Sequence, residues 1–263
     1  MSNVLKVVIL TVAGIVVYTF LNVAIRRFVA GIRSREDYDE DVDGKMTKAE
    51  KKAAEEAKVL EAEKKKVGLK EVLQEYGIRF YVVIILGAIL SGLIGFFFGL
   101  SVKAAIFFVF FTMLTAITFV DFDTMEIPPV LSWGILPLGI IAIWAVPEIP
   151  LKDRIIGAVS VSGFMLIVAL IVKGGFGGGD IKLMFSAGFL LGWKGIVTGF
   201  FAGLFIGAII GVASMVKSKK GMKDHIPFGP SLCAGLVLAS LIGDKLVNWY
   251  WNIIKMSLSN PYK

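Results

Sequence analysis

The sequence has one cysteine and one histidine among its 263 residues. The single cysteine, Cys233, cannot form a disulfide within the chain or supply the thiolates of a cysteine-rich zinc cluster. The histidine, His225, stands just before the last apolar segment, and no serine or cysteine is placed to act with it as a nucleophile. These absences exclude the common nucleophilic hydrolase arrangements and leave carboxylates as the candidate catalytic groups.

The chain also lacks the alternating apolar and polar segments of a membrane β-barrel. Instead it is 56% hydrophobic, and several continuous apolar runs reach the roughly 20 residues that cross a bilayer as a helix. The composition therefore predicts an all-α polytopic membrane protein in contact with lipid. The net charge of +7 then indicates basic flanks that set membrane topology, rather than nucleic-acid binding.

The hydropathy pattern predicts about eight transmembrane helices. One of them, 181–193, is short, since its helix would measure only about 20 Å. The positive-inside rule expects the richest basic loops, 26–79 and 217–223, to lie in the cytoplasm. Both do so only if 181–193 is a separate membrane span and the N-terminus is outside. The predicted spans are 4–28, 80–100, 104–120, 129–146, 155–172, 181–193, 196–216 and 226–251.

The predicted organisation has three parts: an N-terminal helix at 1–30, a large charged cytoplasmic loop at 31–78 and a membrane-embedded domain at 79–263. The first span has no small-residue cleavage site, so we expect a retained anchor. Within the loop, Thr47 to Glu50 has the form of a capping box and predicts a solvated helix from about Lys48. The loop also carries a cluster of acids, Glu36, Asp37, Asp39, Glu40, Asp41 and Asp43. This cluster is a solvated linker or a site that recognises a basic segment of a substrate.

Two acidic sites at span edges fall on the same predicted cytoplasmic face. One is a short loop with Asp121 and Asp123, and the other is a glycine run that ends at Asp180. An acid at a helix centre costs about 2.5 to 3.5 kcal/mol on insertion scales, so acids at membrane depth are usually functional. The alternatives are that Asp180 is a helix N-cap and that Asp121 and Asp123 are ordinary loop residues.

A pair of carboxylates at such a site can hydrolyse a peptide bond. Two carboxylates brought close in a low-dielectric site share one proton, so that one can act as general base on water while the other donates to the scissile carbonyl. Gly177, Gly178 and Gly179 would permit unusual backbone angles and the close approach of a substrate backbone. An extended substrate segment in a membrane needs such backbone partners.

The residues around these acids resemble the type IV prepilin peptidases, a GxGD family of membrane aspartyl proteases. The segment 175–183 is similar to the family's second aspartate motif, and its Gly177 to Asp180 forms the GxGD. Asp121 stands six residues before the Ile127-Pro128 pair, as in the first motif, and this register selects Asp121 rather than Asp123. Segments 226–230 (Ile-Pro-Phe-Gly-Pro) and 20–26 resemble two further family elements, so the resemblance covers almost the whole chain apart from 31–78.

The resemblance implies an aspartic endopeptidase that removes the basic leader of type IV prepilins or pseudopilins at the cytoplasmic face of the bacterial inner membrane. Asp121 and Asp180 would be catalytic, and Gly177, Gly178, Gly179 and Lys182 would line the substrate cleft, Lys182 either biasing the charge of the acids or snorkelling. Many bacterial members also methylate the new N-terminus with S-adenosylmethionine, whereas proteolysis needs no cofactor.

The chain departs from the family pattern in two ways. Pro129 replaces an acid that often follows the Ile-Pro pair, and the loop at 31–78 lacks the CxxC pairs that bind zinc in many members, so we expect no metal there. A proton-coupled transporter that uses Asp121 and Asp180 as an ion relay is the alternative function, although the halves show no inverted repeat. A catalytically dead assembly scaffold is a further alternative, against which the intact pair of acids argues.

Overall fold

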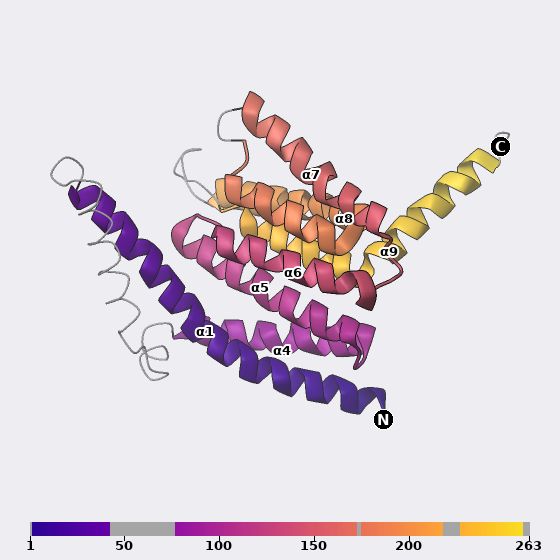
Figure 1. Cartoon of the computed structure of the whole chain (residues 1–263), viewed down its shortest axis with the longest axis horizontal. Coiled ribbons are helices and arrows are strands. Elements are labelled where there is room, and N and C mark those ends of the chain that lie inside the picture. Colours follow the sequence, from indigo (N-terminus) through magenta and orange to yellow (C-terminus); the bar gives the residue numbers. More distant parts are fainter. Residues whose placement is uncertain (1, 43–76, 173–174, 218–226, 260–263) are drawn as a thin grey trace. The chain divides into compact units, whose positions relative to one another are not determined.

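The computed structural model describes residues 2–42, 77–172, 175–217 and 227–259. Every regular element in these ranges is an α-helix (Figure 1). The helices are α1 (Asn3–Val42), α4 (Ile78–Phe98), α5 (Val102–Thr124), α6 (Pro129–Ala145), α7 (Leu151–Ile171), α8 (Gly178–Lys217) and α9 (Gly229–Ser259).

Five described stretches are long and apolar enough to cross a membrane, by length and composition. Two shorter apolar helices, Pro129–Ala145 and Gly229–Gly243, accompany them. The prediction of an all-α polytopic membrane protein is therefore confirmed. The number of crossings and the orientation of the N-terminus stay predictions. The five stretches are Asn3–Ile32, Ile78–Phe98, Val102–Thr124, Leu151–Ile171 and Gly178–Ser214.

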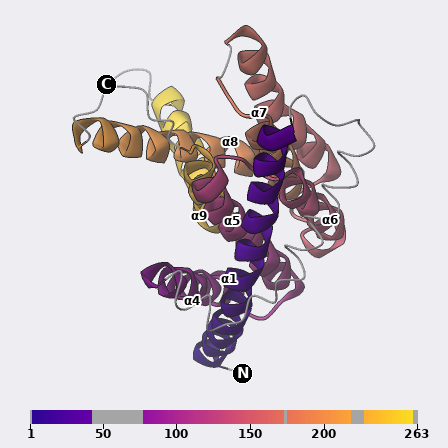
Figure 2. The same cartoon turned by 90° about the vertical axis from the view of Figure 1, so that its left-hand side faces the viewer.

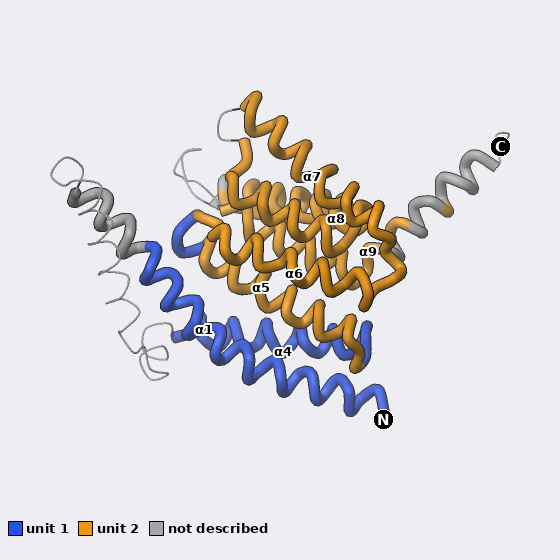
Figure 3. The backbone as a smooth tube through the Cα atoms, viewed as in Figure 1, with its two compact units in different colours: residues 1–99, 122–125 blue, residues 100–121, 126–263 orange. Residues whose placement is uncertain are grey.

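The chain divides into two compact units (Figure 3). The first unit contains residues 1–99 together with 122–125, and the second contains residues 100–121 together with 126–263. Both predicted catalytic aspartates, Asp121 and Asp180, belong to the second unit.

In the first unit, α1 and α4 lie side by side, as Figures 1 and 2 both show. Small residues permit this contact, since a Cβ atom on Gly87 would overlap the ring of Tyr18. Asn22 of the predicted family element 20–26 is buried, and its amide donates to the Tyr18 carbonyl at 3.0 Å and weakly to the Phe80 carbonyl at 3.5 Å. A polar side chain on an apolar span is thereby satisfied by backbone.

In the second unit, α7 and α9 both pack against α8. The contact with α7 brings Gly157 to Gly188, where an added Cβ would lie 2.5 Å from the Gly188 carbonyl oxygen. The contact with α9 brings Gly235 against Gly199 and Gly203 with no room for a side chain. Close backbone approach of this kind is how apolar helices associate without a hydrophobic driving force between them.

The long helix α8 is broken at Gly192, whose φ of 71° and ψ of 174° are not helical. A straight helix from 178 to 200 would measure about 33 Å, yet the rings of Phe176 and Phe200 lie 6.3 Å apart. The chain must therefore reverse direction at Gly192. The break lies at Gly192, near the end of the predicted segment 181–193, while the division into two membrane crossings stays a prediction.

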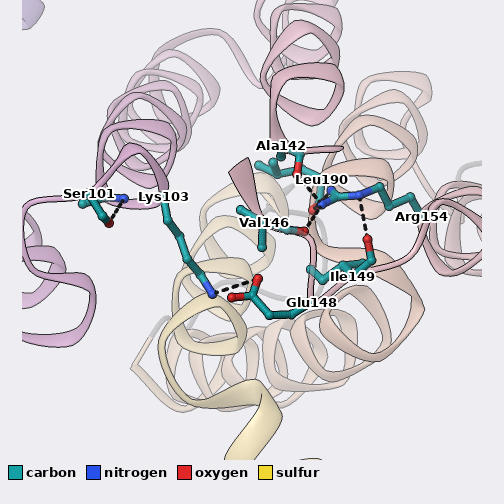
Figure 4. A network of polar contacts seen from close by, with 9 residues as sticks. Ser101, Lys103, Ala142, Val146, Glu148, Ile149, Arg154 and Leu190 are labelled. Atoms are coloured by element: carbon teal, nitrogen blue, oxygen red, sulfur yellow. Dashed lines mark hydrogen bonds and ion pairs between the residues drawn. The ribbon is translucent and has the colours of Figure 1, made fainter. Parts of the chain in front are cut away.

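The buried side chain of Arg154 fixes this turn to the neighbouring helices (Figure 4). Its Nη1 donates to the carbonyls of Phe189 and Leu190, which end the first part of α8. Its Nη2 donates to Ala142 and Val146 at the end of α6, and its Nε donates to Ile149. All five guanidinium N–H groups thus bind backbone oxygens, and the cation lies at two helix C-termini, where the helix dipole favours positive charge.

Several helix ends differ from the prediction. Helix α1 continues to Val42, so the segment from Gly31 to Val42, expected in the charged loop, is helical and contains most of the acidic cluster. Helix α9 begins at Gly229, whereas the predicted span begins at residue 226. Phe228 is the N-cap, because its carbonyl accepts the first hydrogen bonds of the helix, and Pro227 stands just before it. The charged helix predicted from Lys48 lies outside the described residues.

Candidate active site

Asp121 lies in the last turn of α5, which continues through Asp123 to Thr124. The prediction that Asp121 and Asp123 occupy a short loop is therefore wrong, because the polar residues after Val120 extend the helix instead of ending it. The Asp121 side chain is buried, with the residue 4% exposed. Its Oδ2 accepts a hydrogen bond from the backbone N–H of Gly229 at 3.1 Å.

The start of α9 explains why the N–H of Gly229 is available. The N–H groups of Ser231 and Leu232 bind the carbonyl of Phe228, and Pro230 has no N–H. Gly229 therefore supplies the unpaired donor of the first turn, and the carboxylate of Asp121 satisfies it. A negative group at this position is also favoured by the dipole of α9.

Asp180 occupies the first turn of α8, and it is 9% exposed. The alternative that it is an N-cap is wrong, because the Gly177 carbonyl accepts the first helical hydrogen bond, from Ile181. Gly177 is thus the N-cap, and Asp180 is the third helical residue. Its Oδ2 accepts from the Gly177 N–H at 3.2 Å, which is the carboxylate half of a capping box.

Ile127 connects the two aspartate segments. A Cβ atom on Gly179 would lie 2.7 Å from the Ile127 Cβ and 2.8 Å from its carbonyl oxygen. A Cβ atom on Gly229 would lie 3.0 Å from the Ile127 Cδ1 and 2.6 Å from the Asp121 Oδ2. The buried isoleucine therefore packs between the glycine that precedes Asp180 and the glycine that binds Asp121.

The two aspartates and Cys233 form one electrostatic neighbourhood. Asp121 is near enough to Asp180 for its charge to act on the Asp180 carboxyl. The buried Cys233 thiol lies near the Thr118 hydroxyl and within range of both carboxylates. Thr118 stands one helical turn before Asp121 on α5, and Cys233 stands one turn after Gly229 on α9.

The remaining predicted site residues divide into described and undescribed ones. Gly177 and Gly178 are exposed, and Lys182 is half-buried. The backbone of 36–42 belongs to α1, while the side chains of the acidic cluster, together with Asp43 and His225, lie outside what the structure describes.

No group of three or more His, Cys, Asp and Glu side chains that could hold a metal ion occurs among the described residues.

Sequence reasoning did not identify the hydrogen bond from Gly229 to Asp121, the packing of Ile127 on Gly179, or the place of Cys233 within range of both carboxylates. The Ile-Pro and Ile-Pro-Phe-Gly-Pro segments were recognised only as family elements. The available signal was their position, because one follows Asp121 closely and the other opens the last span. The residues that these two segments contact can be identified only from the tertiary structure.

Comparisons with known proteins point to the same part of the chain as the candidate active site. A family model described as Peptidase_A24, the type IV leader peptidase family, matches residues 108–212. This range includes both Asp121 and Asp180. No solved structure matches the chain.

Several curated proteins named prepilin leader peptidase/N-methyltransferase are similar to the chain. The one from Bacillus subtilis (strain 168) is 34% identical over 161 residues, which cover 61% of this chain and 64% of the relative. The one from Legionella pneumophila is 29% identical over 66% of this chain and 63% of the relative. The one from Pseudomonas aeruginosa is 31% identical over 66% of this chain and 62% of the relative.

The chain thus spans less than two thirds of the length of these relatives. Residues 108–212, which carry both aspartates, match the model of the type IV leader peptidase family.

Proposed function

We propose that the protein is an aspartic endopeptidase that removes the basic leader from type IV prepilins or pseudopilins. The family match and the names of the relatives support this activity and substrate class. The apolar helices place the chain in a membrane. We infer the bacterial inner membrane from the similarity to bacterial prepilin peptidases, and cleavage at its cytoplasmic face from the predicted topology of the two aspartate segments.

The observation that carries the proposal is the arrangement of Asp121 and Asp180. Both are buried in the same compact unit, and the charge of one acts on the other. Each of the two carboxylates accepts a hydrogen bond from the backbone N–H of a glycine. Two interacting buried carboxylates are the arrangement that aspartic proteases use.

The dyad would work with one shared proton. The ionised carboxylate takes a proton from water, whose oxygen forms a bond to the scissile carbonyl carbon, while the protonated carboxyl gives its proton to the carbonyl oxygen. The resulting gem-diol then breaks its C–N bond: the leaving amine takes a proton from the carboxyl that accepted one from water, and a hydroxyl of the gem-diol returns its proton to the other carboxylate, which restores the shared proton. We do not divide the roles between Asp121 and Asp180, because a coupled pair titrates as a unit.

The names of the relatives also include N-methyltransferase activity, for which S-adenosylmethionine would be the donor. A cavity of about 300 Å³ in the first unit is lined by Asn3, Val4, Val7, Val8 and Phe96. This lining has no charged side chain for the cofactor's amino-acid end, so the cavity does not fit the group. We derive no methyl-transfer step.

The comparisons give no support to the alternative of a proton-coupled transporter. The members of the matched family and the relatives described above are peptidases by name.

The test uses the full-length protein, purified in detergent, with a synthetic prepilin that carries its basic leader. We expect Asp121→Asn and Asp180→Asn each to lower the cleavage rate by a factor of about 1,000 or more, because either change removes the shared proton system. Mass spectrometry of the products would show whether the cut lies at the junction between leader and apolar helix.

Asp123→Asn is the matched control. Asp123 is on the same helical turn as Asp121, and its Oδ1 pairs with the Arg79 guanidinium at 2.6 Å. We expect this variant to retain cleavage within about 10-fold, since asparagine keeps an oxygen acceptor for Arg79. Cleavage retained in either Asp121→Asn or Asp180→Asn would rule out the dyad.

A further inference from the structure

The two aspartates are held by the same short unit of sequence, a phenylalanine followed by a glycine. Phe176 precedes Gly177, whose N–H binds Asp180, and Phe228 precedes Gly229, whose N–H binds Asp121. The rings of Phe176 and Phe228 lie against each other, with centroids 5.8 Å apart and planes at 47°. Two segments that are distant in the sequence therefore meet through their phenylalanines, while their glycines hold the two acids.

The planarity of the peptide bond relates the backbone of each phenylalanine to the neighbouring glycine N–H. The N–H of a glycine lies in the same rigid plane as the carbonyl of the preceding phenylalanine. Fixing the backbone of Phe176 or Phe228 therefore fixes the direction of the N–H that points at an aspartate. At Phe228 the carbonyl is held as well, because it accepts from Ser231 and Leu232.

Both rings also pack on the second part of α8. Phe176 contacts the buried Phe200 with centroids 6.3 Å apart. Phe228 lies against Gly207, where an added Cβ would be 3.1 Å from the Phe228 ring. This helix segment thus gives both phenylalanines a common support, so a shift of either ring would be passed to the other.

We propose that Phe176 and Phe228 are a positioning pair whose ring contact holds the backbone donors of Asp180 and Asp121 in register with each other. The proposal rests on the proposed function, since it concerns the geometry of the two acids in that reaction. Neither ring is assigned a contact with substrate.

The test compares Phe176→Leu, Phe228→Leu and the double variant with the wild type. Leucine keeps an apolar side chain but removes the aromatic contact. We expect each single change to lower kcat by about 10-fold to 100-fold with KM nearly unchanged, because small misplacements of catalytic groups have effects of this size. The double variant should be no slower than the slower single variant, since one lost ring already breaks the contact.

Phe164→Leu is the matched control. Phe164 contacts the same Phe200, at 6.1 Å between centroids, but it does not precede a glycine that binds an aspartate. We expect it to keep kcat within about 3-fold of the wild type, because no backbone donor to Asp121 or Asp180 adjoins it. Phe228→Tyr keeps the ring and should also keep the wild-type rate. Thermal unfolding in detergent would show that all variants are folded.

A second readout does not depend on cleavage. Infrared spectroscopy of the carboxyl band against pH should show a displaced protonation midpoint in Phe176→Leu and Phe228→Leu, and an unchanged midpoint in Phe164→Leu. If the wild type cleaves no prepilin while the displacement occurs, the proposed function fails and the positioning pair stands. Unchanged midpoints, or rate effects that multiply in the double variant, would overturn the positioning pair while leaving the peptidase intact.

Discussion

Ile127 packs so closely on Gly179 that a Cβ atom added to the glycine would lie 2.7 Å from the Ile127 Cβ. The carbonyl oxygen of Ile127 would be 2.8 Å away, and backbone atoms cannot rotate aside. We therefore expect Gly179→Ala to lower stability by about 1 to 3 kcal/mol, as overpacking does, and to lower cleavage because Asp180 is the next residue. Gly211→Ala, where the added Cβ meets no atom within 4 Å, is the control for an alanine in the same helix. Equal melting temperatures for the two variants would contradict this account.

Gly178 differs from its neighbour, since a Cβ atom there would meet no atom within 4 Å. Alanine is favoured over glycine in helices by about 1 kcal/mol, so Gly178→Ala should leave the melting temperature equal or higher. If Gly178 belongs to the substrate cleft, the new methyl group occupies space that the substrate backbone uses, and KM should rise. Measured KM and melting temperature together test the cleft assignment, and an unchanged KM would remove Gly178 from it.

Gly229 presents its N–H to Asp121 at a distance that leaves no room for a side chain. A Cβ atom there would lie 2.6 Å from the Asp121 Oδ2 and 3.0 Å from the Ile127 Cδ1. We expect Gly229→Ala to displace the carboxylate and to lower kcat by about 100-fold, the size of effect that a 1 Å misplacement produces. Steady-state cleavage assays would measure kcat, with thermal unfolding as the check on folding. A wild-type kcat in a folded variant would show that the hydrogen bond does not position Asp121.

These contacts show why the sequence alone predicts some of the site and not the rest. The length of the apolar runs predicts the helices, and the spacing of Asp121 before Ile127 and the GxGD at Asp180 identify the two acids by resemblance. The hydrogen bond from Gly229 joins residues that are 108 positions apart, and no local pattern specifies it. Contacts of this kind arise from packing among α5, α8 and α9.

The glycine run 174–179 illustrates a second reason why the sequence alone does not predict the whole site. From sequence, its glycines are expected to adopt unusual backbone angles, yet among the described glycines positive φ occurs at Gly77, Gly99 and Gly192 instead. Close approach explains the role of Gly179, because Ile127 fills the space where a side chain would be. A glycine in the sequence can reflect either a positive φ or a neighbouring residue that occupies the place of a side chain. The sequence alone does not distinguish these two reasons.

Arg154 does not stand out in the sequence, because a basic residue near the end of an apolar run usually reflects membrane topology. The structure instead buries it completely, with its five N–H groups on the carbonyls of five residues. We expect Arg154→Met to lower stability by at least about 3 kcal/mol, because buried carbonyls lose charged donors. Lys152→Met is the control, since it removes the same charge from an exposed position in the same helical turn. Similar melting temperatures for the two variants would contradict a structural role for Arg154.

The acidic cluster of Glu36, Asp37, Asp39, Glu40, Asp41 and Asp43 provides the last prediction, because it would attract the basic leader of a prepilin. Opposite charges raise encounter rates, and this effect is screened as salt is added. We therefore expect replacement of all six acids by their amides to raise KM by about 10-fold at low ionic strength, with kcat unchanged. At high salt the variant and the wild type should converge, which separates attraction of the leader from damage to the dyad. A synthetic prepilin with a neutral leader is the matched substrate, and its KM should be the same for both proteins. If neutralising the cluster leaves the KM for the basic leader unchanged at low salt, the leader is recognised elsewhere and the interpretation of the cluster as a solvated linker holds.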